Sequence, residues 1–551
     1  MAGTGQTDVR GAVSDLLFEA RVLRAAGVIG PMRPDKALRV GSTFLRWGAS
    51  PGAGVAVAAI ETPHEIAILD ERGSLTWERL HRRSNALAHS FEALGIGPGD
   101  GIGVMARNHR GFLETTLAAA KLGASALHLN TMFAGPQLVE VMKREGPKAL
   151  VHDEEFGDLL AQVEPGVRRI IAWHDGAPPA GATTVEQLIA AGDESDLPPP
   201  ADKPRFVILT SGTTGTPKGA QRSSPDGLMT LASLLDMIPY RSGSTIVIAA
   251  PLFHSWGFLH FVVSLPTNST MVLRRRFDPE ETLKAIERTG ADVLAVVPVM
   301  VQRILGLPDE VLSRYKLPSL KIAALSGSAL PGELATLWMD RFGDNIYNLY
   351  GSTEVSFATI ATPADLRAAP GTAGRPPRGT VVRLFDEAGE EVPKGEVGRI
   401  FVGNDMKMEG YTGGGNKEAI DGLLSSGDVG HFDPDGRLFV DGRDDEMIVS
   451  GGENVFPREV EDLLADLDGV AEVAIIGVAD EKFGQRLKAF VVLEEGASLS
   501  EVELGAHVKA NLAAYKMPRE VEFLAELPRN ATGKVLKREL HAREAAGRDA
   551  Q

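Results

Sequence analysis

Short apolar runs alternate with helix-like stretches along much of the chain. Between about Thr62 and Ile360 several of these runs are continuously apolar, as expected for strands that are covered on both faces. The predicted strands are Gly101–Ala106, Lys148–Asp153, Arg205–Thr210, Ser244–Ala250, Asp292–Pro298 and Lys321–Gly327. Because helical stretches separate them, the pattern predicts βαβ units and parallel sheets. The Pro-rich polar stretch from Gly192 to Pro204 is predicted to be a linker between two such blocks.

The pattern changes after about Gly371, where short strands separated by Gly and Pro turns predict a small β-rich unit. A compact α+β tail is expected from about Glu446. In this tail Pro457–Ala465 is predicted to be a helix with proline in its first turn. Ser500 and Glu503 have the spacing of a capping box, which predicts the start of another helix.

These segments predict an α/β protein in three parts. Residues 1–60 form a helical extension, in which Ala12–Ala26 is expected to pack on the main body because it lacks the Lys/Arg-rich polar face of a membrane-surface helix. Residues 61–444 form a large N-terminal domain of two parallel-sheet α/β subdomains plus the β-rich unit. Residues 445–551 form a small α+β C-terminal domain.

Composition narrows the classes of function. The chain has 551 residues, no cysteine, and 57 Lys and Arg against 74 Asp and Glu, for a net charge of −17. The lack of cysteine excludes disulfides, a thiol nucleophile and thiolate metal sites. The negative charge argues against a nucleic-acid partner. The first residues lack a signal-peptide pattern and no apolar stretch could span a bilayer, so a cytoplasmic protein with at most peripheral membrane association is expected.

The strongest chemical signal is the loop after the strand Arg205–Thr210. The ten positions from Thr210 to Gly219 hold five hydroxyl residues, three glycines and one lysine. Glycines let the backbone present N–H groups to an anion, and hydroxyls and an ammonium add donors for phosphate. The candidate nucleotide-binding residues here are Thr210, Ser211, Gly212, Thr213, Thr214, Gly215 and Lys218. The alternative is an ordinary polar surface turn. A Walker A loop is disfavoured, because Pro217 precedes Lys218 and Gly219 follows it.

A second motif, Gly48-Ala49-Ser50-Pro51-Gly52, matches the G-x-S-x-G pattern of a serine nucleophile. In that pattern the residue after the serine donates a backbone N–H to the oxyanion, and Pro51 has no N–H. We therefore expect a loop here and no serine nucleophile. The sequence also has no dense cluster of His and acidic residues for a metal held by protein ligands alone.

Five further motifs follow the 210–219 loop in a fixed order. They are Tyr350–Glu354 (YGSTE), Ser426–Asp428 (SGD), Gly442–Asp445 (GRDD), Ser450–Asn454 (SGGEN) and Pro528–Lys534 (PRNATGK). Together the six motifs resemble those of the adenylate-forming superfamily, which includes acyl-CoA synthetases, luciferases and peptide-synthetase adenylation domains. The resemblance runs from about residue 60 to 545, and the segment 427–457 most resembles bacterial fatty acyl-CoA ligases.

The resemblance implies roles around the nucleotide. Thr353 would contact phosphate, Glu354 would hold Mg²⁺, and Tyr350 would pack on adenine. Asp428 would accept the ribose hydroxyls, with Arg443 on the ribose side. Without the other motifs, Glu354 would be a solvated surface charge, and Asp428 and Arg443 a turn residue and a surface ion pair.

The resemblance also implies the residues around the acid. Lys534 would reach the substrate carboxylate and the α-phosphate oxygens, where a fixed cation lowers the repulsion between two anions. His254 would lie near the carboxylate and, with Trp256, Gly327 and Gly351, would line the acyl pocket. The alternatives are an exposed flexible lysine and a structural histidine.

A moving C-terminal domain follows from the same resemblance. The domain would rotate about a hinge at Asp445 after the first step of the reaction. This rotation would bring a segment that contains Gly451, Gly452, Glu453 and Asn454 to the site for the step with coenzyme A.

The expected function is an acid–thiol ligase that uses ATP, Mg²⁺ and coenzyme A. A medium- or long-chain fatty acid is the first choice of substrate. An aryl or sterol-side-chain acid is the alternative, as is a separate carrier protein in place of coenzyme A, although no carrier domain follows in the sequence. Alternatives of other classes are a non-catalytic nucleotide-binding protein and a P-loop ATPase or kinase. The sequence does not fix the oligomeric state, and a homodimer is compatible with it.

Overall fold

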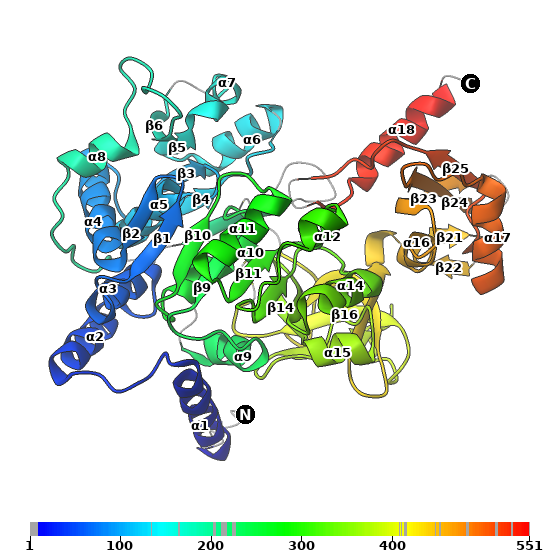
Figure 1. The fold of residues 1–551 in the computed structure, drawn as a ribbon, viewed down its shortest axis with the longest axis horizontal. Coiled ribbons are helices and arrows are strands. Elements are labelled where there is room, and N and C mark those ends of the chain that lie inside the picture. The colour runs from blue at the N-terminus through cyan, green and yellow to red at the C-terminus, as the bar shows by residue number, and fades with distance from the viewer. Residues whose placement is uncertain are drawn as a thin grey trace, which may run out of the picture.

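The computed structural model describes residues 9–133, 135–163, 166–201, 205–210, 218–222, 227–406, 408, 410–412, 416–446, 448–450, 453–480, 484–512, 516–530 and 533–549. Within these residues the strands form four sheets: two large and mainly parallel, one small and antiparallel, and one in a C-terminal unit that follows residue 446. Figure 1 shows the C-terminal unit, in orange and red, at one end of the molecule. No helix in the described part of the chain is long and apolar enough to cross a membrane.

The first large sheet has eight strands in the order β14-β13-β12-β11-β9-β10-β1-β2. Neighbours are parallel except at the two edges, where β14 and β2 run antiparallel to the strand beside them. Its strands are β1 (Ile66–Asp70), β2 (Gly73–Thr76), β9 (Thr245–Ile248), β10 (Thr270–Leu273), β11 (Val293–Val296), β12 (Ile322–Leu325), β13 (Ile346–Ser352) and β14 (Ser356–Ala361).

The second large sheet has seven strands in the order β17-β8-β7-β4-β3-β5-β6. Its central neighbours are parallel, and β8 and β17 continue it as antiparallel strands. Its strands are β3 (Gly101–Met105), β4 (Ser125–His128), β5 (Ala149–Asp153), β6 (Arg168–Trp173), β7 (Phe206–Thr210), β8 (Lys218–Arg222) and β17 (Gly410–Tyr411). All six strands predicted from apolar runs are therefore present in the two sheets.

The strand order shows that the predicted division by the linker is wrong. β1 precedes the linker but joins the first sheet, where Ile68 pairs with Met271. β7 follows the linker but joins the second sheet, where Ala126 pairs with Phe206. Local apolar runs predict strands but carry no information on their long-range partners, so the sequence pattern could not reveal this exchange.

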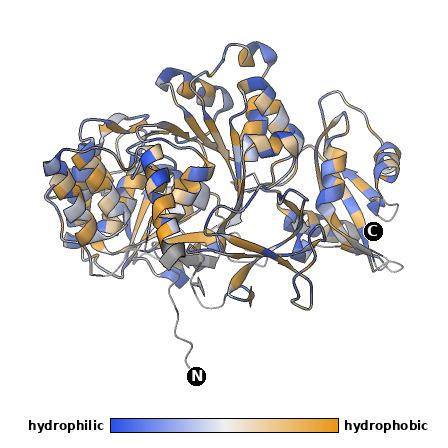
Figure 2. Ribbon diagram, turned by 90° about the horizontal axis from the view of Figure 1, so that it is seen from below, coloured by the Kyte–Doolittle hydropathy of each residue, from blue (hydrophilic) through white to orange (hydrophobic). Residues whose placement is uncertain are grey.

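The burial of alternate residues explains the continuous apolar strands. In β5, Ala149 and Val151 belong to a core beneath α4, α5 and α8, whereas Leu150 between them belongs to a core beneath α6 and α7. Successive residues of a strand point to opposite faces, so a sheet with helices on both sides needs apolar residues throughout. Figure 2 shows mainly orange strands between helices that are blue on their outer side.

Helices cover both faces of the large sheets and of the C-terminal sheet. The helices are α1 (Val9–Ala26), α2 (Pro34–Trp47), α3 (Pro51–Glu61), α4 (Trp77–Ala93), α5 (Arg110–Leu122), α6 (Gly135–Glu145), η1 (Glu154–Phe156), α7 (Gly157–Leu160), α8 (Val185–Ala191), α9 (Met229–Met237), α10 (Ser255–Ser264), α11 (Pro279–Thr289), α12 (Pro298–Leu305), α13 (Asp309–Leu312), α14 (Gly332–Phe342), α15 (Pro363–Ala368), η2 (Asp444–Glu446), α16 (Pro457–Ala465), α17 (Glu501–Asn511) and α18 (Lys537–Asp549).

The N-terminal helices belong to the body of the molecule. In α1, Phe18, Val22 and Leu23 are buried in the main core, which confirms the prediction that this helix packs on the protein. In α3, Val55 and Ala58 belong to the same core. The helical segment predicted for residues 1–60 therefore contributes directly to the interior.

The prediction of a loop over Gly48–Gly52 is wrong in its second half. Ser50 is the N-cap of α3, and its Oγ accepts a hydrogen bond from the N–H of Ala53 at 3.2 Å. Pro51 occupies the first turn, where its missing N–H costs nothing. A serine followed by proline is a helix-start signal.

The small sheet and the C-terminal sheet complete the fold. The small sheet holds β15 (Val381–Phe385), β16 (Gly398–Gly403), β18 (Ala419–Ile420), β19 (Leu423–Phe432) and β20 (Leu438–Arg443). The C-terminal sheet holds β21 (Ile448–Ser450), β22 (Glu453–Val455), β23 (Val470–Asp480), β24 (Gly484–Leu493) and β25 (Glu520–Phe523). α16 has the predicted bounds, and the capping box of Ser500 and Glu503 is confirmed at the start of α17.

Candidate active site

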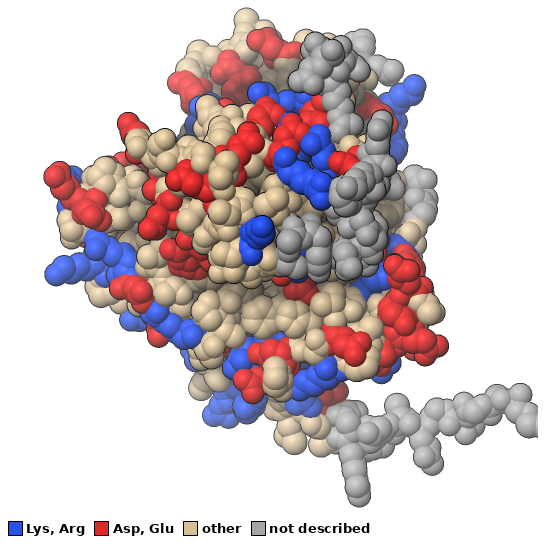
Figure 3. All heavy atoms as spheres, turned by 90° about the vertical axis from the view of Figure 1, so that its right-hand side faces the viewer, with Lys and Arg blue, Asp and Glu red and all other residues tan. Residues whose placement is uncertain are grey.

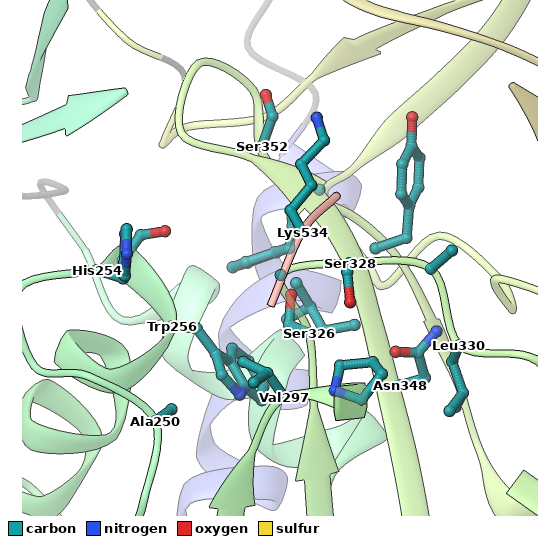
Figure 4. A pocket seen from close by; sticks show the side chains of 18 of the residues that line it. Ala250, His254, Trp256, Val297, Ser326, Ser328, Leu330, Asn348, Ser352 and Lys534 are labelled. Carbon is teal, nitrogen blue, oxygen red and sulfur yellow. The ribbon is translucent and has the colours of Figure 1, made fainter. Parts of the chain in front are cut away.

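A cavity with a volume of about 1480 Å³ is lined by residues of both large parts of the chain. The first large sheet contributes the ends of its strands, and the small sheet contributes β19 and β20. The C-terminal unit contributes the segment that precedes α18. Figure 4 shows Lys534 of this segment extending into the cavity along the turn that carries Ser352, with His254 and Trp256 on another wall.

Three of the predicted residues form one hydrogen-bonded cluster. Asp428 and Arg443 face each other as cross-strand partners on β19 and β20. Arg443 Nη1 donates to Asp428 Oδ1 at 3.1 Å, and the Tyr350 hydroxyl donates to Asp428 Oδ2 at 2.6 Å. No sequence pattern predicts that Tyr350, 78 positions from Asp428, hydrogen-bonds to it.

Charge and burial oppose each other in this cluster. Burial raises the pKa of Asp428, and the positive charge of Arg443 counteracts that rise. Burial and the neighbouring Asp428 carboxylate raise the pKa of Tyr350, so its hydroxyl stays protonated and can act as the donor. The arrangement presents a phenol ring and a carboxylate side by side at the cavity wall.

Thr353 and Glu354 lie in the tight turn between β13 and β14. The Ser352 hydroxyl oxygen accepts the backbone N–H of Glu354 at 3.2 Å and that of Val355 at 3.3 Å, which fixes the turn. The Tyr411 hydroxyl donates to Glu354 Oε1 at 3.0 Å and so orients the carboxylate. Burial and this carboxylate raise the pKa of Tyr411. Sequence reasoning missed Tyr411, since an aromatic residue in a polar loop carries no specific signal.

The predicted phosphate loop connects two paired strand ends. Thr210 ends β7 and Lys218 begins β8, and the two residues are antiparallel partners. Ser211, Gly212, Thr213, Thr214 and Gly215 lie outside the described residues. β8 pairs in turn with β17, where Ala220 is opposite Tyr411. The base of the loop is thereby connected through Tyr411 to Glu354.

The turn before Lys534 is held by its own residues and by α12. Asn530 Oδ1 accepts the backbone N–H of Lys534 at 2.9 Å, and Asn530 O accepts that of Gly533 at 2.9 Å. Gly533 has a φ of +79°, and a Cβ there would lie 2.1 Å from Val299 Cγ1 on α12. The backbone before Lys534 therefore touches the N-terminal part, and the charge of Lys534 is close enough to lower the pKa of Asp428.

His254 stands before α10 as a half-buried residue at the cavity wall. Burial lowers its pKa to about 4, so the imidazole is neutral near pH 7. Its Nε2 has no hydrogen-bond partner among the described residues. Trp256 donates its indole N–H to Val296 O at 2.9 Å, which fixes the ring as a wall of the cavity.

Gly327 and Gly351 both line the cavity, but different structural requirements favour glycine at the two positions. Gly327 has a φ of +93° and keeps its Cβ side open, with Val297 at 3.5 Å. At Gly351 a Cβ would lie 1.9 Å from the carbonyl oxygen of Ser356 on β14. Gly351 is therefore glycine because the neighbouring strand approaches its backbone closely, and its place in the acyl pocket stays a prediction.

An apolar arm of the cavity leads from Trp256 toward the N-terminal helices. We call this part of the cavity the apolar arm; its walls come from α9, α10 and α3, together with Phe44 of α2. The apolar lining residues are Phe44, Pro51, Gly54, Val57, Leu228, Leu231, Leu234, Leu259, Val262, Val263 and Leu265. The sequence pattern predicts no functional role for the first 60 residues, because the contribution of α3 depends on tertiary packing.

The predicted hinge lies in η2, the short helix that precedes the C-terminal sheet. Asp445 is its central residue. Lys537 Nζ binds Glu446 Oε2 at 3.0 Å and Glu461 Oε1 at 2.9 Å, so the end of η2 is tied to α16 and α18. Glu453 and Asn454 lie on β22, paired with β21, and Gly451 and Gly452 lie outside the described residues.

Nothing in the described residues forms a group of three or more His and acidic side chains that could hold a metal ion. The cavity instead offers single carboxylates, of which Glu354 stands in the same turn as Thr353. One carboxylate is a sufficient protein ligand for Mg²⁺ where phosphate oxygens and water complete the shell. The donor set fits a metal that arrives with a nucleotide.

Comparison with known proteins agrees with this geometry. Residues 55–412 match the AMP-binding enzyme family, and residues 459–534 match the AMP-binding enzyme C-terminal domain. A feruloyl-CoA synthase of Amycolatopsis sp is 35% identical over 493 residues, which cover 88% of this chain and 96% of that protein. A fatty acid–[acyl-carrier-protein] ligase, ScoC, of Streptomyces coeruleorubidus is 32% identical, with 87% and 94% covered.

Among solved structures, the o-succinylbenzoate CoA synthetase (MenE) of Bacillus subtilis in complex with its acyl-adenylate intermediate superposes with a TM-score of 0.78 at 27% identity. The match covers 88% of this chain and 97% of that one. The fold, the order of the motifs and the family match lead to one conclusion: the chain belongs to the AMP-binding enzyme family, within the adenylate-forming superfamily.

Proposed function

We propose that this family member is an ATP-dependent acyl-CoA ligase that activates a medium- or long-chain fatty acid. The observation that carries the proposal is that Lys534, from the C-terminal unit, lines the same cavity as Glu354 and the Asp428 cluster. An apolar arm leads away from this point. A nucleotide, a carboxylate and a cation would thus meet in one place.

The nucleotide would be held by the cluster and the turn. Tyr350 offers a ring face for adenine, and Asp428 offers a carboxylate for the ribose hydroxyls. Asn348 Oδ1 is a buried acceptor that also lines the cavity and suits an amino group of the base. Thr353 and the loop 210–218 would donate to the phosphates. Glu354 would hold Mg²⁺, which neutralises phosphate charge when bound.

In the first step a carboxylate oxygen of the acid attacks the α-phosphorus of ATP. The new P–O bond gives an acyl-adenylate, and the bond to pyrophosphate breaks. Because two anions approach each other, a fixed ammonium stabilises the charge that develops in the transition state. Lys534 suits this role, and the neutral His254 can hydrogen-bond near the carboxylate without adding charge.

In the second step the thiol of coenzyme A loses its proton, its sulfur attacks the acyl carbon, and AMP departs. No enzyme nucleophile is needed, in keeping with a chain that has no cysteine. We assign the hinge at Asp445 to the change between the two steps. We assign Gly451, Gly452, Glu453 and Asn454 to the arrangement that receives coenzyme A.

The choice of a fatty acid rests on the arm of the cavity. Its walls are aliphatic or aromatic over three helices, and such a lining binds a chain by burial of apolar surface. An aryl acid is the second candidate, supported by the 35% identity to a feruloyl-CoA synthase. A carrier protein as the thiol is a variant of the same chemistry, supported by the likeness to ScoC.

The test measures pyrophosphate and AMP release with Mg²⁺ and ATP over a panel of hexanoate, dodecanoate, palmitate, ferulate and indoleacetate. Each acid is assayed alone, with coenzyme A and with a phosphopantetheinylated carrier protein. We expect acid-dependent pyrophosphate release, thioester only with a thiol, and the highest kcat/KM for dodecanoate or palmitate. Preference for ferulate would select the aryl alternative. Release of ADP and phosphate, or no acid-dependent release, would contradict the proposal.

The role of Lys534 has its own test. Lys534→Ala should slow adenylate formation by about 10²–10³-fold, because a charge aimed at the transition state is lost. Thioester formation from supplied acyl-adenylate should be largely kept. Lys509→Ala, an exposed lysine on α17 of the same unit, is the matched control. A Lys534→Ala enzyme that forms adenylate at the wild-type rate would remove Lys534 from the mechanism.

A further inference from the structure

The helix α2 exposes large apolar side chains to solvent. None of its residues is buried. Leu45 is 91% exposed and Leu38 is 77% exposed. The two leucines are seven residues apart, two turns of helix, and so lie on the same side. An exposed apolar strip of this kind on a globular protein marks a surface that meets a partner.

The opposite side of α2 is held by the protein. The Trp47 ring lies against Gly52 of α3, where an added Cβ would come within 3.1 Å of it. Lys36 Nζ donates to Glu61 O at the other end of α3, at 2.7 Å. Phe44 lines the cavity. The helix is therefore docked along one side, and the side with Leu38 and Leu45 faces outward.

The charge of α2 is opposite to that of the whole chain. It carries Lys36, Arg39 and Arg46 against one acidic residue, Asp35, whereas the chain has a net charge of −17. Figure 3 views the end of the molecule away from α2, where acidic and basic side chains are interspersed. A helix with exposed leucines, aromatic residues and a basic polar face suits the interface of an anionic bilayer.

The acyl arm reaches the surface beside this helix. Phe44 and Ala49 both line the cavity, and both are exposed, Phe44 by 42%. The wall of the arm is thus continuous with the outer surface where α2 passes into α3. A long-chain acid dissolved in a bilayer could enter here with its apolar tail kept out of water.

We propose that α2 docks on an anionic lipid surface through Leu38 and Leu45, with Arg39 and Arg46 at the headgroups. The docking sets the end of the acyl arm against the membrane from which the acid is drawn. This inference rests on the proposed function only in taking the substrate to be a long-chain acid. The binding surface itself stands on the exposure and charge of α2.

The other helix with exposed leucines serves as a contrast. Leu16 and Leu17 of α1 are 65% and 66% exposed. Beside them Asp15 binds Arg378 at 2.8 Å, and Glu19 adds a second acid on the same helix. These two acids offset most of the basic charge of α1, and Arg21 is already paired with Asp236 at 3.3 Å. Because α1 offers less free positive charge to anionic headgroups than α2 does, we assign docking to α2 and not to α1.

The test is cosedimentation of the full chain with vesicles of phosphatidylcholine alone or mixed with phosphatidylglycerol. We expect binding to the anionic vesicles that falls at high salt. Leu38→Gln/Leu45→Gln and Arg39→Gln/Arg46→Gln should each weaken binding at least about ten-fold. Val502→Gln removes an apolar side chain that is 79% exposed on α17, at the other end of the molecule, and should leave binding unchanged.

Activity assays with soluble and vesicle-bound acids test membrane docking separately from the proposed ligase function. With hexanoate in solution, both double variants should match the wild type, whereas with palmitate supplied in anionic vesicles their rate should fall. Wild type that turns over palmitate but does not bind vesicles would overturn the docking and leave the ligase function intact. Dimerisation that depends on Leu38 and Leu45, measured by light scattering without vesicle binding, would assign this surface to a second copy and also overturn it.

Discussion

At the scale of single residues, the site depends on close backbone approaches as much as on functional groups. Gly533 combines a φ of +79° with a Cβ direction that Val299 blocks at 2.1 Å. It immediately precedes Lys534 in the sequence, so any displacement of its backbone moves the lysine. The glycine of this motif is therefore part of how the cation reaches the cavity.

Gly533→Ala should reduce adenylate formation at least about ten-fold, because the turn must withdraw from α12 and the residue also resists a positive φ. Thioester formation from supplied acyl-adenylate should change little. Gly496→Ala is the control, since Gly496 also has a positive φ of +85° but nothing within 4 Å of an added Cβ. Half-reaction assays on both variants make the comparison. Equal losses would show that strain and not contact with Val299 matters.

The sequence predicted most of the residues that now line one cavity. Tyr350, Glu354, Asp428, Arg443 and Lys534 were identified through ordered motifs, and the structure brings them together. The contacts between these residues could not be predicted from the sequence, because each contact joins elements that meet only in the folded chain. The same reason explains why two further lining residues, Tyr411 and Asn348, were missed.

At the scale of elements, local sequence signals correctly predicted the helix starts and bounds that are set by neighbouring residues. The capping box at Ser500 and the bounds of α16 agree with the structure. The wrong prediction of a loop at Pro51 has a local cause as well, since Ser50 followed by Pro51 is itself a signal for the start of a helix. The η2 element shows the limit of such rules, because no local pattern says whether a short helix is a hinge.

Asp445→Pro should leave adenylate formation near the wild-type rate and block thioester formation. Proline fixes φ near −65° and removes an N–H, so a backbone that must change conformation at this position loses that freedom. The two half-reactions are measured separately, by pyrophosphate release and by thioester formation from acyl-adenylate. Glu387→Pro, at the second position of the exposed turn closed by the hydrogen bond from the Gly389 N–H to Asp386 O, controls for a general effect of proline. Loss of both half-reactions in Asp445→Pro would reject the hinge.

Two acidic side chains meet at the boundary between the two units. Glu333 on α14 and Asp466 after α16 are hydrogen-bonded across the boundary. Burial and the acidic neighbour raise the pKa of Glu333. Because two carboxylates face each other here, ionisation of both disfavours this contact.

At the scale of the whole molecule, three histidines with lowered pKa values affect stability. Burial lowers the pKa of His128 to about 3 and the pKa values of His254 and His260 to about 4. His260 is fixed in its neutral form, since its Nδ1–H donates to Trp256 O at 3.0 Å and its Nε2 accepts the Tyr240 hydroxyl at 2.9 Å. Folding therefore excludes protons that the unfolded chain would bind.

The free energy of unfolding should fall as pH falls from about 6.5 toward 4, because the unfolded histidines take up protons that the folded ones refuse. Three such groups correspond to about 4 kcal/mol per pH unit in the middle of this range. Urea unfolding at pH 7, 6 and 5 measures the slope. His260→Gln should reduce the slope by about a third. A slope that His260→Gln leaves unaltered would contradict the neutral state of that imidazole.

The exchange of strands across the linker has a consequence for synthesis of the chain. β1 and β2 leave the ribosome long before β10, which starts at Thr270 and completes their side of the sheet. β3 to β6 likewise wait for β7 on the far side of the linker. A nascent chain halted near residue 200 would hold two open sheet edges at once, which is the form in which chains aggregate. We therefore expect the first 200 residues expressed alone to depend more strongly on chaperones than the full protein does.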